Sequence, residues 1–96
     1  MSQKEQFEKD IEFQDSAIAR DLFGAHEKNL ETLSEKTGVQ VTARGTNVLL
    51  RSENKQDLDL ASKCLFQLYD LLRSGHSLHA QDMEYALRIL SNNPET

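Results

Sequence analysis

Residues 22–41 constrain the fold of this chain most, because two glycines divide them into two helical segments and the start of a strand. Gly24 directly follows an apolar segment, in the place of the left-handed residue that commonly ends a helix. A second amphipathic segment follows and ends at Gly38. Beyond it, apolar and polar residues alternate over residues 39–44, which is typical of a strand with one face in water. The pattern predicts two closely connected helices followed directly by a strand.

The residues before this stretch predict another strand and define the first of the two helices. Residues 10–13 alternate between charged and apolar side chains, which favours a half-buried strand. Asp15 is a good N-cap, and a helix with one apolar face is expected over residues 16–23. The second helix is expected over residues 27–37.

The residues after it predict a third strand. A tight connection at residues 45–47 should join the strand at 39–44 to a strand at residues 48–51. Residues 48–50 are all apolar, so this last strand has apolar side chains on both faces. It should therefore lie in the centre of its sheet.

Two further helices complete the chain. Asn54 begins a capping pattern, and a continuous leucine-rich stripe predicts the longest helix over residues 55–74. A final helix is expected over residues 80–91. Leu78 and Met83 are spaced as a hydrophobic staple at its start.

The order of elements predicts the fold class. A strand, two helices, two strands, a long helix and a shorter helix form an α+β domain of two layers, in which helices pack on one face of a three-stranded sheet. A chain of 96 residues has room for one modest core. We expect a flexible N-terminus at residues 1–8, the folded domain at residues 9–91, and a linker at residues 92–96.

The charge balance limits how such a domain can bind nucleic acid. The chain has 16 acidic and 11 basic side chains, and its net charge is −5. Because phosphate binding depends on a cationic surface, this total argues against binding through the overall field of the protein. It leaves open a small basic face on an acidic body.

The sequence predicts a cytoplasmic protein without a membrane segment. No apolar run approaches the roughly 18 residues that would suggest a membrane span. The first residues lack the apolar segment of a signal peptide. The single cysteine, Cys64, cannot form an internal disulfide and falls in an apolar helical pattern, which indicates a core residue in a reducing compartment.

The order of elements, together with residues 22–41, resembles the type I KH domain. KH domains carry a glycine-x-x-glycine loop between two helices, and a threonine-glycine-valine-like turn before a strand. Gly24 matches the first loop glycine, and Asn29 and Leu30 follow it at the family's spacing. Residues 37–39 match the turn. Glu27 occupies the place of the second loop glycine and departs from the family pattern.

Most of the chain is also similar to the N-terminal segment of PhoH-like proteins, the phosphate-starvation-inducible type of P-loop ATPase. The matching segments are ARDLFG at 19–24, NL at 29–30, ARGTNV at 43–48, LYDLL at 68–72 and LHAQDMEYA at 78–86. PhoH-like proteins begin with a degenerate KH-like domain and continue into an ATPase domain. The glycine-rich loop of that ATPase does not occur here. The resemblance therefore implies that an ATPase domain, which would bind ATP and magnesium, lies beyond Thr96.

The resemblance also implies a nucleic-acid site around the loop between the first two helices. Its candidate residues are Arg20, Gly24, His26, Lys28 and Arg44. In an intact KH loop, two glycines let the backbone approach the phosphates of a single strand. Glu27 would place a carboxylate there, at a cost on the order of 1 kcal/mol in water. The alternative is that the cations are solvated surface charges, neutralised by nearby carboxylates.

The last two helices offer a different kind of site. Phe66, Tyr69 and Tyr85 fall partly outside the apolar stripes, where aromatic side chains can anchor a protein partner. They could equally complete the core. His76 and His79 have no carboxylate or cysteine partner at a metal-ligand spacing. No nucleophile pattern accompanies the Ser, His and Asp residues. We expect no catalysis and no cofactor within this chain.

Two functions follow as alternatives. The first is a non-catalytic KH-like domain that assists a PhoH-like ATPase by binding single-stranded or ribosomal RNA, or an RNA-processing protein. The second is a docking or oligomerisation module that contacts its own ATPase domain or another subunit and binds no nucleic acid itself.

Overall fold

The computed structural model describes residues 6–92 of the chain. In this range the elements are β1 (Phe7–Glu12), α1 (Ser16–Phe23), a 3₁₀ turn η1 (Ala25–Glu27), α2 (Lys28–Thr37), β2 (Gln40–Arg44), β3 (Asn47–Ser52), α3 (Lys55–Arg73) and α4 (Ala80–Asn92). This is the order predicted for an α+β, KH type I-like domain with an additional C-terminal helix.

The three strands form one antiparallel sheet in the order β1-β3-β2. β3 is central, which confirms the prediction made from its apolar residues. Val48 and Leu50 are fully buried on the face that the helices cover, and Leu49 is partly buried on the opposite face. The central position thus follows from a strand that has apolar side chains on both faces.

A two-residue turn joins β2 to β3. Arg44 pairs with Asn47, so only Gly45 and Thr46 lie between the strands. Gly45 has a φ of 61°. A positive φ at the first position is what the favoured two-residue hairpin turns require, and glycine adopts it without steric cost.

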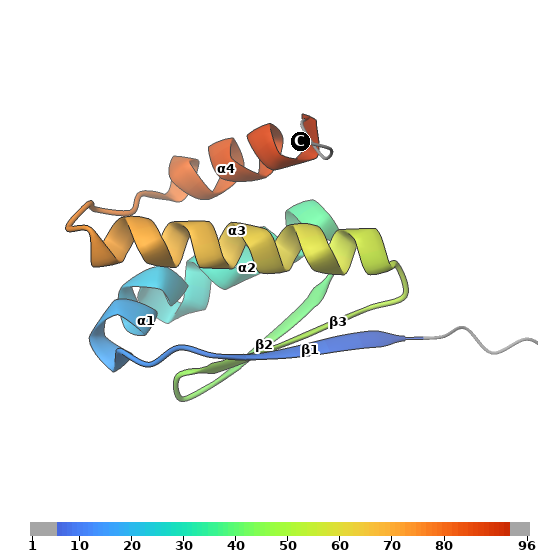
Figure 1. Ribbon diagram of the computed structural model, residues 1–96, viewed down its shortest axis with the longest axis horizontal. Helices are drawn as coiled ribbons and strands as arrows, with labels where there is room; N and C mark the ends of the chain where they lie inside the picture. Colours follow the sequence, from blue (N-terminus) through green and yellow to red (C-terminus); the bar gives the residue numbers. More distant parts are fainter. Residues whose placement is uncertain (1–5, 93–96) are drawn as a thin grey trace, which may run out of the picture.

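The four helices lie on one side of the sheet, as predicted (Figure 1). α2 and α3 pack on the strands, and α1 packs on α3 and α2 at one end of this layer. α4 lies farthest from the sheet, where it packs on α3 and α2. The two-layer architecture therefore carries a further helix on its outer side.

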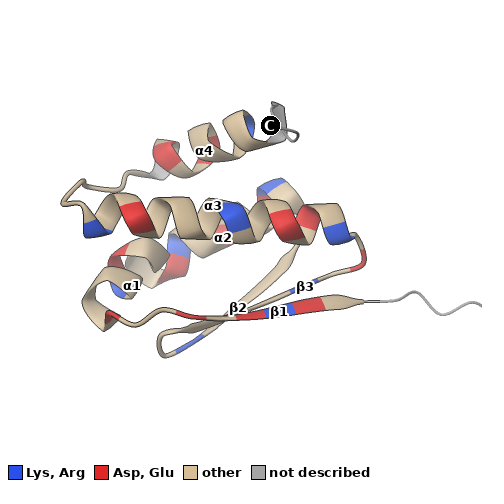
Figure 2. Ribbon diagram, viewed as in Figure 1, with Lys and Arg blue, Asp and Glu red and all other residues tan. Residues whose placement is uncertain are grey.

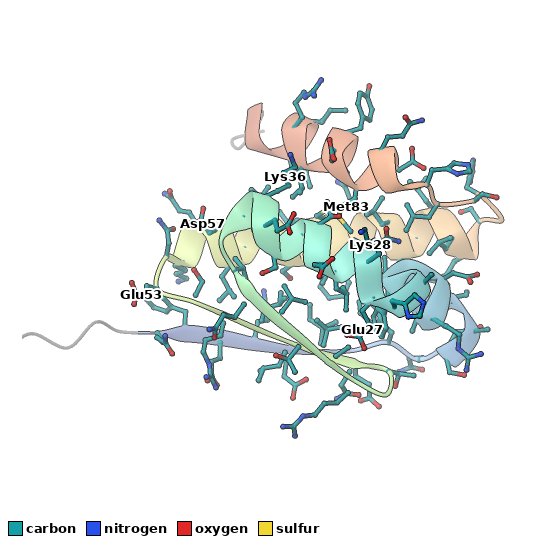
Figure 3. All side chains as sticks on the ribbon, turned by 180° about the vertical axis from the view of Figure 1, so that it is seen from behind. Glu27, Lys28, Lys36, Glu53, Asp57 and Met83 are labelled. Atoms are coloured by element: carbon teal, nitrogen blue, oxygen red, sulfur yellow. The ribbon has the colours of Figure 1, made fainter. Side chains whose placement is uncertain are left out.

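The core fills the space between the helices and the covered face of the sheet. Its largest fully buried side chains include Leu22, Leu50 and Leu65. Met83 extends this core into the contact between α4 and α3, where its sulfur lies 3.5 Å from the Sγ atom of Cys64 (Figure 3). Burial raises the pKa of the Cys64 thiol to about 12. The thiol is therefore neutral at physiological pH and acts as a core group, as predicted.

β1 begins at Phe7, earlier than the strand predicted at residues 10–13. It pairs with β3 along the whole length of that strand, so tertiary pairing outweighs the poor strand propensity of its glutamates and lysine. Residues 7 and 8 therefore belong to the sheet and not to the expected N-terminal tail. Phe13 lies just beyond β1, although it is buried and its backbone N–H donates to the carbonyl oxygen of Thr46.

The ends of α1 and α3 agree closely with the prediction. α1 covers residues 16–23 as expected, and the Asp15 carboxylate accepts the backbone N–H groups of Ala17 and Ile18. α3 ends at Arg73, one position before the predicted end. α4 runs to Asn92, so this residue belongs to the helix and not to the expected linker, and residues 93–96 lie outside the described residues.

Truncation of Met83 should show that α4 is part of the folded domain. We expect Met83→Ala to lower the free energy of unfolding by about 2–5 kcal/mol, because it leaves a cavity at a fully buried position. Tyr85→Ala, on the same helix but exposed, should change it by less than about 0.5 kcal/mol. Urea denaturation followed by circular dichroism measures both. Equal effects would contradict this account of α4.

Candidate nucleic-acid interface

The connection between α1 and α2 has an unusual backbone. Gly24 has φ 83° and ψ 171°, a conformation that belongs essentially to glycine. His26 and Glu27 have φ values of 55° and 58°, and they are the only non-glycine residues with positive φ in the described part of the chain. Each left-handed residue of this kind costs about 1 kcal/mol or more. The helix predicted from residue 27 therefore starts at Lys28, after a strained turn.

A buried hydrogen bond explains why this turn needs Gly24. The side chain of Asn29 is only 8% exposed, and its Nδ2 atom donates to the carbonyl oxygen of Leu22 at 3.1 Å. A Cβ atom added to Gly24 would lie 2.8 Å from that Nδ2 atom. The spacing between Gly24 and Asn29 thus has a structural role, because the amide of α2 completes the C-terminal end of α1.

A hollow of about 440 Å³ lies between this turn and the turn that joins β2 to β3. We call it the first hollow. It is lined by Ser16, Arg20, Phe23, Gly24, His26, Glu27, Gly45 and Thr46. The hollow therefore brings together two loops that are about twenty residues apart in sequence.

A second hollow of about 490 Å³ lies between α1 and the connection from α3 to α4. It is lined by Arg20, Asp21, Gly24, Ala25, Leu72, His76, Ser77 and Leu78. Arg20 and Gly24 line both hollows. The α1–α2 turn is therefore bordered by two different parts of the chain.

The structure brings three of the five nucleic-acid candidates together. Arg20, Gly24 and His26 all line the first hollow. Lys28 begins α2 and lines neither hollow; Figure 3 shows it apart from Glu27, with Lys36 at the opposite end of the helix. Arg44 lies at the end of β2, where the alternation with partly buried Ala43 places it on the uncovered face of the sheet. Lys28 and Arg44 thus line neither hollow, although they were predicted as candidates together with the other three.

Arg20 is the main cation of the site. It is exposed, and it makes no ion pair with any residue among those that the structure describes. The carboxylates of Asp21 and Glu27 line the hollows without pairing with it. Elsewhere acidic and basic residues are interspersed along the helices, without one broad basic face (Figure 2). The positive charge available here is therefore local.

Tyr69 has a structural role in this arrangement. Its hydroxyl accepts the backbone N–H of Asp15 at 3.1 Å, and its ring packs on Phe13 with 4.8 Å between ring centroids. Tyr69 therefore ties α3 to the start of α1. Of the predicted docking residues it is the one that completes the core, an alternative that the sequence left open.

Phe66 and Tyr85 are the exposed members of the predicted docking set. Phe66 is 47% exposed and contacts Phe13 edge-on at 6.1 Å between ring centroids. Tyr85 is 63% exposed and lines a hollow of about 310 Å³ together with other residues of α4 only. The two aromatic side chains therefore belong to different surroundings and not to one anchor.

The sequence did not indicate Ser16, Thr46, His76 or Ser77 as site residues. They come from the start of α1, the β-hairpin turn and the connection after α3. The hairpin was predicted as a turn, but nothing in its residues says that it faces the Gly24 turn. Only tertiary packing, in which α1 lies against α3 and α2, places these groups together.

Comparisons with known proteins add no family to this picture. No protein-family model, curated protein or solved structure matches the chain. Within the described residues, no cluster of three or more His, Cys, Asp or Glu side chains could hold a metal ion. No helix there has both the length and the apolar character needed to cross a membrane.

A double-mutant cycle tests the contact between Gly24 and Asn29. We expect Gly24→Ala to lower the free energy of unfolding by about 1–3 kcal/mol, through positive φ and the clash with the amide. Asn29→Ala should cost about 1–3 kcal/mol by removing a buried hydrogen bond. The double variant should lose at least about 0.5 kcal/mol less than the sum, because the clash disappears with the amide.

Gly38→Ala is the matched control for this cycle. Gly38 also has a positive φ, of 77°, but no atom lies within 4 Å of an added Cβ. Gly38→Ala should lower the free energy of unfolding by about 1 kcal/mol, and this effect should add to that of Asn29→Ala. Strict additivity of Gly24→Ala with Asn29→Ala in chemical denaturation would contradict the packing account.

The strain at Glu27 predicts a reversed order of substitutions. A left-handed alanine pays about 1–2 kcal/mol, whereas glycine pays only about 0.5–1 kcal/mol of extra chain entropy. Glu27→Gly should therefore be more stable than Glu27→Ala by roughly 0.5–1 kcal/mol, opposite to the order inside a helix. Both variants lack the carboxylate, so its charge does not affect the comparison. Thermal unfolding of the pair measures the difference, and a more stable alanine variant would contradict the left-handed backbone.

Proposed function

We propose that this chain is a non-catalytic KH-like domain that helps a PhoH-like ATPase to contact single-stranded RNA, alone or held by an RNA-processing protein. The observation that supports it is the exposed guanidinium of Arg20, which has no ion-pair partner among the described residues and lines the hollows on both sides of the Gly24 turn. This turn is where the resemblance to KH domains implies nucleic acid.

We call the two hollows together the groove. Its residues suit a contact with the sugar-phosphate backbone of RNA. Arg20 can donate two parallel hydrogen bonds to one phosphate. The hydroxyls of Ser16 and Thr46 line the same hollow and can bond to sugar or phosphate oxygens. Phe23 adds an apolar wall. A short single-stranded segment would therefore meet both charge and apolar surface there.

We propose that this contact is weak and auxiliary. The net charge is −5, and Glu27 lies in the first hollow, so one arginine must act against an unfavourable background. When one phosphate of a single strand is neutralised, the logarithm of the binding constant falls with the logarithm of the salt concentration with a slope of about −0.7. In this proposal, the main affinity, ATP and magnesium belong to an ATPase domain outside this chain, and the protein works in the cytoplasm.

The second candidate function is a docking module. The exposed apolar side chains Phe66, Leu71, Tyr85 and Ile89 lie on α3 and α4, and large side chains of this kind can anchor a protein partner. Its own ATPase domain or another subunit would be that partner. In this alternative the domain does not bind RNA, so a titration with single-stranded RNA separates the two functions.

The proposal is tested by titrating labelled octauridylate with the domain at low and moderate salt. Arg20→Glu should weaken binding about tenfold or more, because a charge-assisted hydrogen bond contributes about 1.5–3 kcal/mol. Arg44→Glu makes the same charge change on the uncovered face of the sheet and should weaken binding far less. Fluorescence anisotropy measures both, and circular dichroism confirms folding.

Two outcomes would contradict the proposal. If Arg44→Glu weakens octauridylate binding as much as Arg20→Glu or more, the RNA binds on the uncovered face of the sheet. No salt-sensitive binding by the unmodified domain would leave the docking module as the better function. In that case Phe66→Ala should weaken association with the ATPase domain without changing the fold.

A further inference from the structure

The two hollows beside the Gly24 turn meet at one side chain. The first lies toward the β2–β3 turn and the second toward the α3–α4 connection, and Arg20 lines both. Their volumes, about 440 and 490 Å³, are similar and fall in the range of roughly 300–1,000 Å³ in which proteins hold small ligands. The site therefore consists of two comparable compartments with a shared wall.

The compartments offer the same kinds of polar group. Each has a hydroxyl, an imidazole and a carboxylate. In the first hollow these belong to Ser16, His26 and Glu27. In the second they belong to Ser77, His76 and Asp21. Each therefore presents donors and acceptors that could bond to the sugar or base of one nucleotide.

The charges determine where a phosphate can lie. Arg20 is the only lysine or arginine that lines either hollow, whereas Glu27 lies in the first and Asp21 in the second. A phosphate inside either compartment would meet a carboxylate, and a phosphate at the shared wall would meet the guanidinium. The groove thus favours an internal phosphodiester with uncharged groups on both sides.

We infer that the groove takes two consecutive nucleotides of a single RNA strand, with their connecting phosphodiester at Arg20. One nucleoside occupies the first hollow, and its neighbour occupies the second, against the connection that leads into α4. This inference rests on the proposed function and adds the α3–α4 connection to the RNA site. It also gives the C-terminal helix a role, because α4 holds the end of that connection in place.

The dinucleotide uridylyl-uridine is the probe that tests it, because its single phosphate is internal. Nuclear magnetic resonance titration of the isotope-labelled domain should show shifts at the amides of both Thr46 and Ser77. The double variant His76→Ala/Ser77→Ala should bind the dinucleotide about fivefold more weakly, through the loss of weak hydrogen bonds. His79→Ala, in the same connection but lining neither hollow, is the control and should bind normally.

The results distinguish this inference from the proposed function. Shifts confined to the first hollow, with unchanged affinity in the His76/Ser77 variant, would overturn the two-nucleotide groove. If Arg20→Glu still weakens octauridylate binding in that case, the proposed function stands. If Arg20→Glu has no effect on either probe, both fail.

Discussion

One buried hydrogen bond holds the end of α1 and the start of α2 together. The amide of Asn29 donates to the carbonyl oxygen of Leu22, and it has room to do so only because Gly24 has no side chain. The bond closes the end of α1 and fixes the direction in which α2 leaves. Arg20, one turn earlier on α1, is thereby held between the hairpin turn and the α3–α4 connection. Gly24 resembles the first glycine of a KH loop, but packing against Asn29 already explains why a glycine is needed there.

The same turn shows a conflict between local preference and tertiary packing. His26 and Glu27 adopt left-handed backbone without being glycines, so the turn stores strain that the surrounding contacts must offset. Glu27 also brings negative charge toward the groove. In the proposed function, a phosphate would therefore be favoured only near Arg20, as one local contact where a basic surface would have many. That is why we propose an auxiliary role beside a stronger binding partner.

Much of the fold could be predicted from the sequence, because its signals are local. Asp15 caps α1, and the apolar run at residues 48–50 identifies the central strand. The start of β1 was wrong because its length depends on pairing with β3, which is a long-range contact. For the site, Arg20 and His26 were predicted and lie together, whereas Arg44 lies on the uncovered face of the sheet. The alternation over residues 39–44 gave Arg44 to the polar face of its strand, but only the packing of the helices on the other face separates it from Arg20.

The sequence by itself determined the elements, their order and the central strand, since capping residues, glycines and apolar periodicity act over a few residues. The total charge of −5 also argued against a domain that binds nucleic acid through its overall field. Only the tertiary structure decided which loops border the Gly24 turn. The physical reason is that the packing of α1 against α3 and α2 brings together groups from three distant segments. Arg20 belongs to a groove only because that core forms.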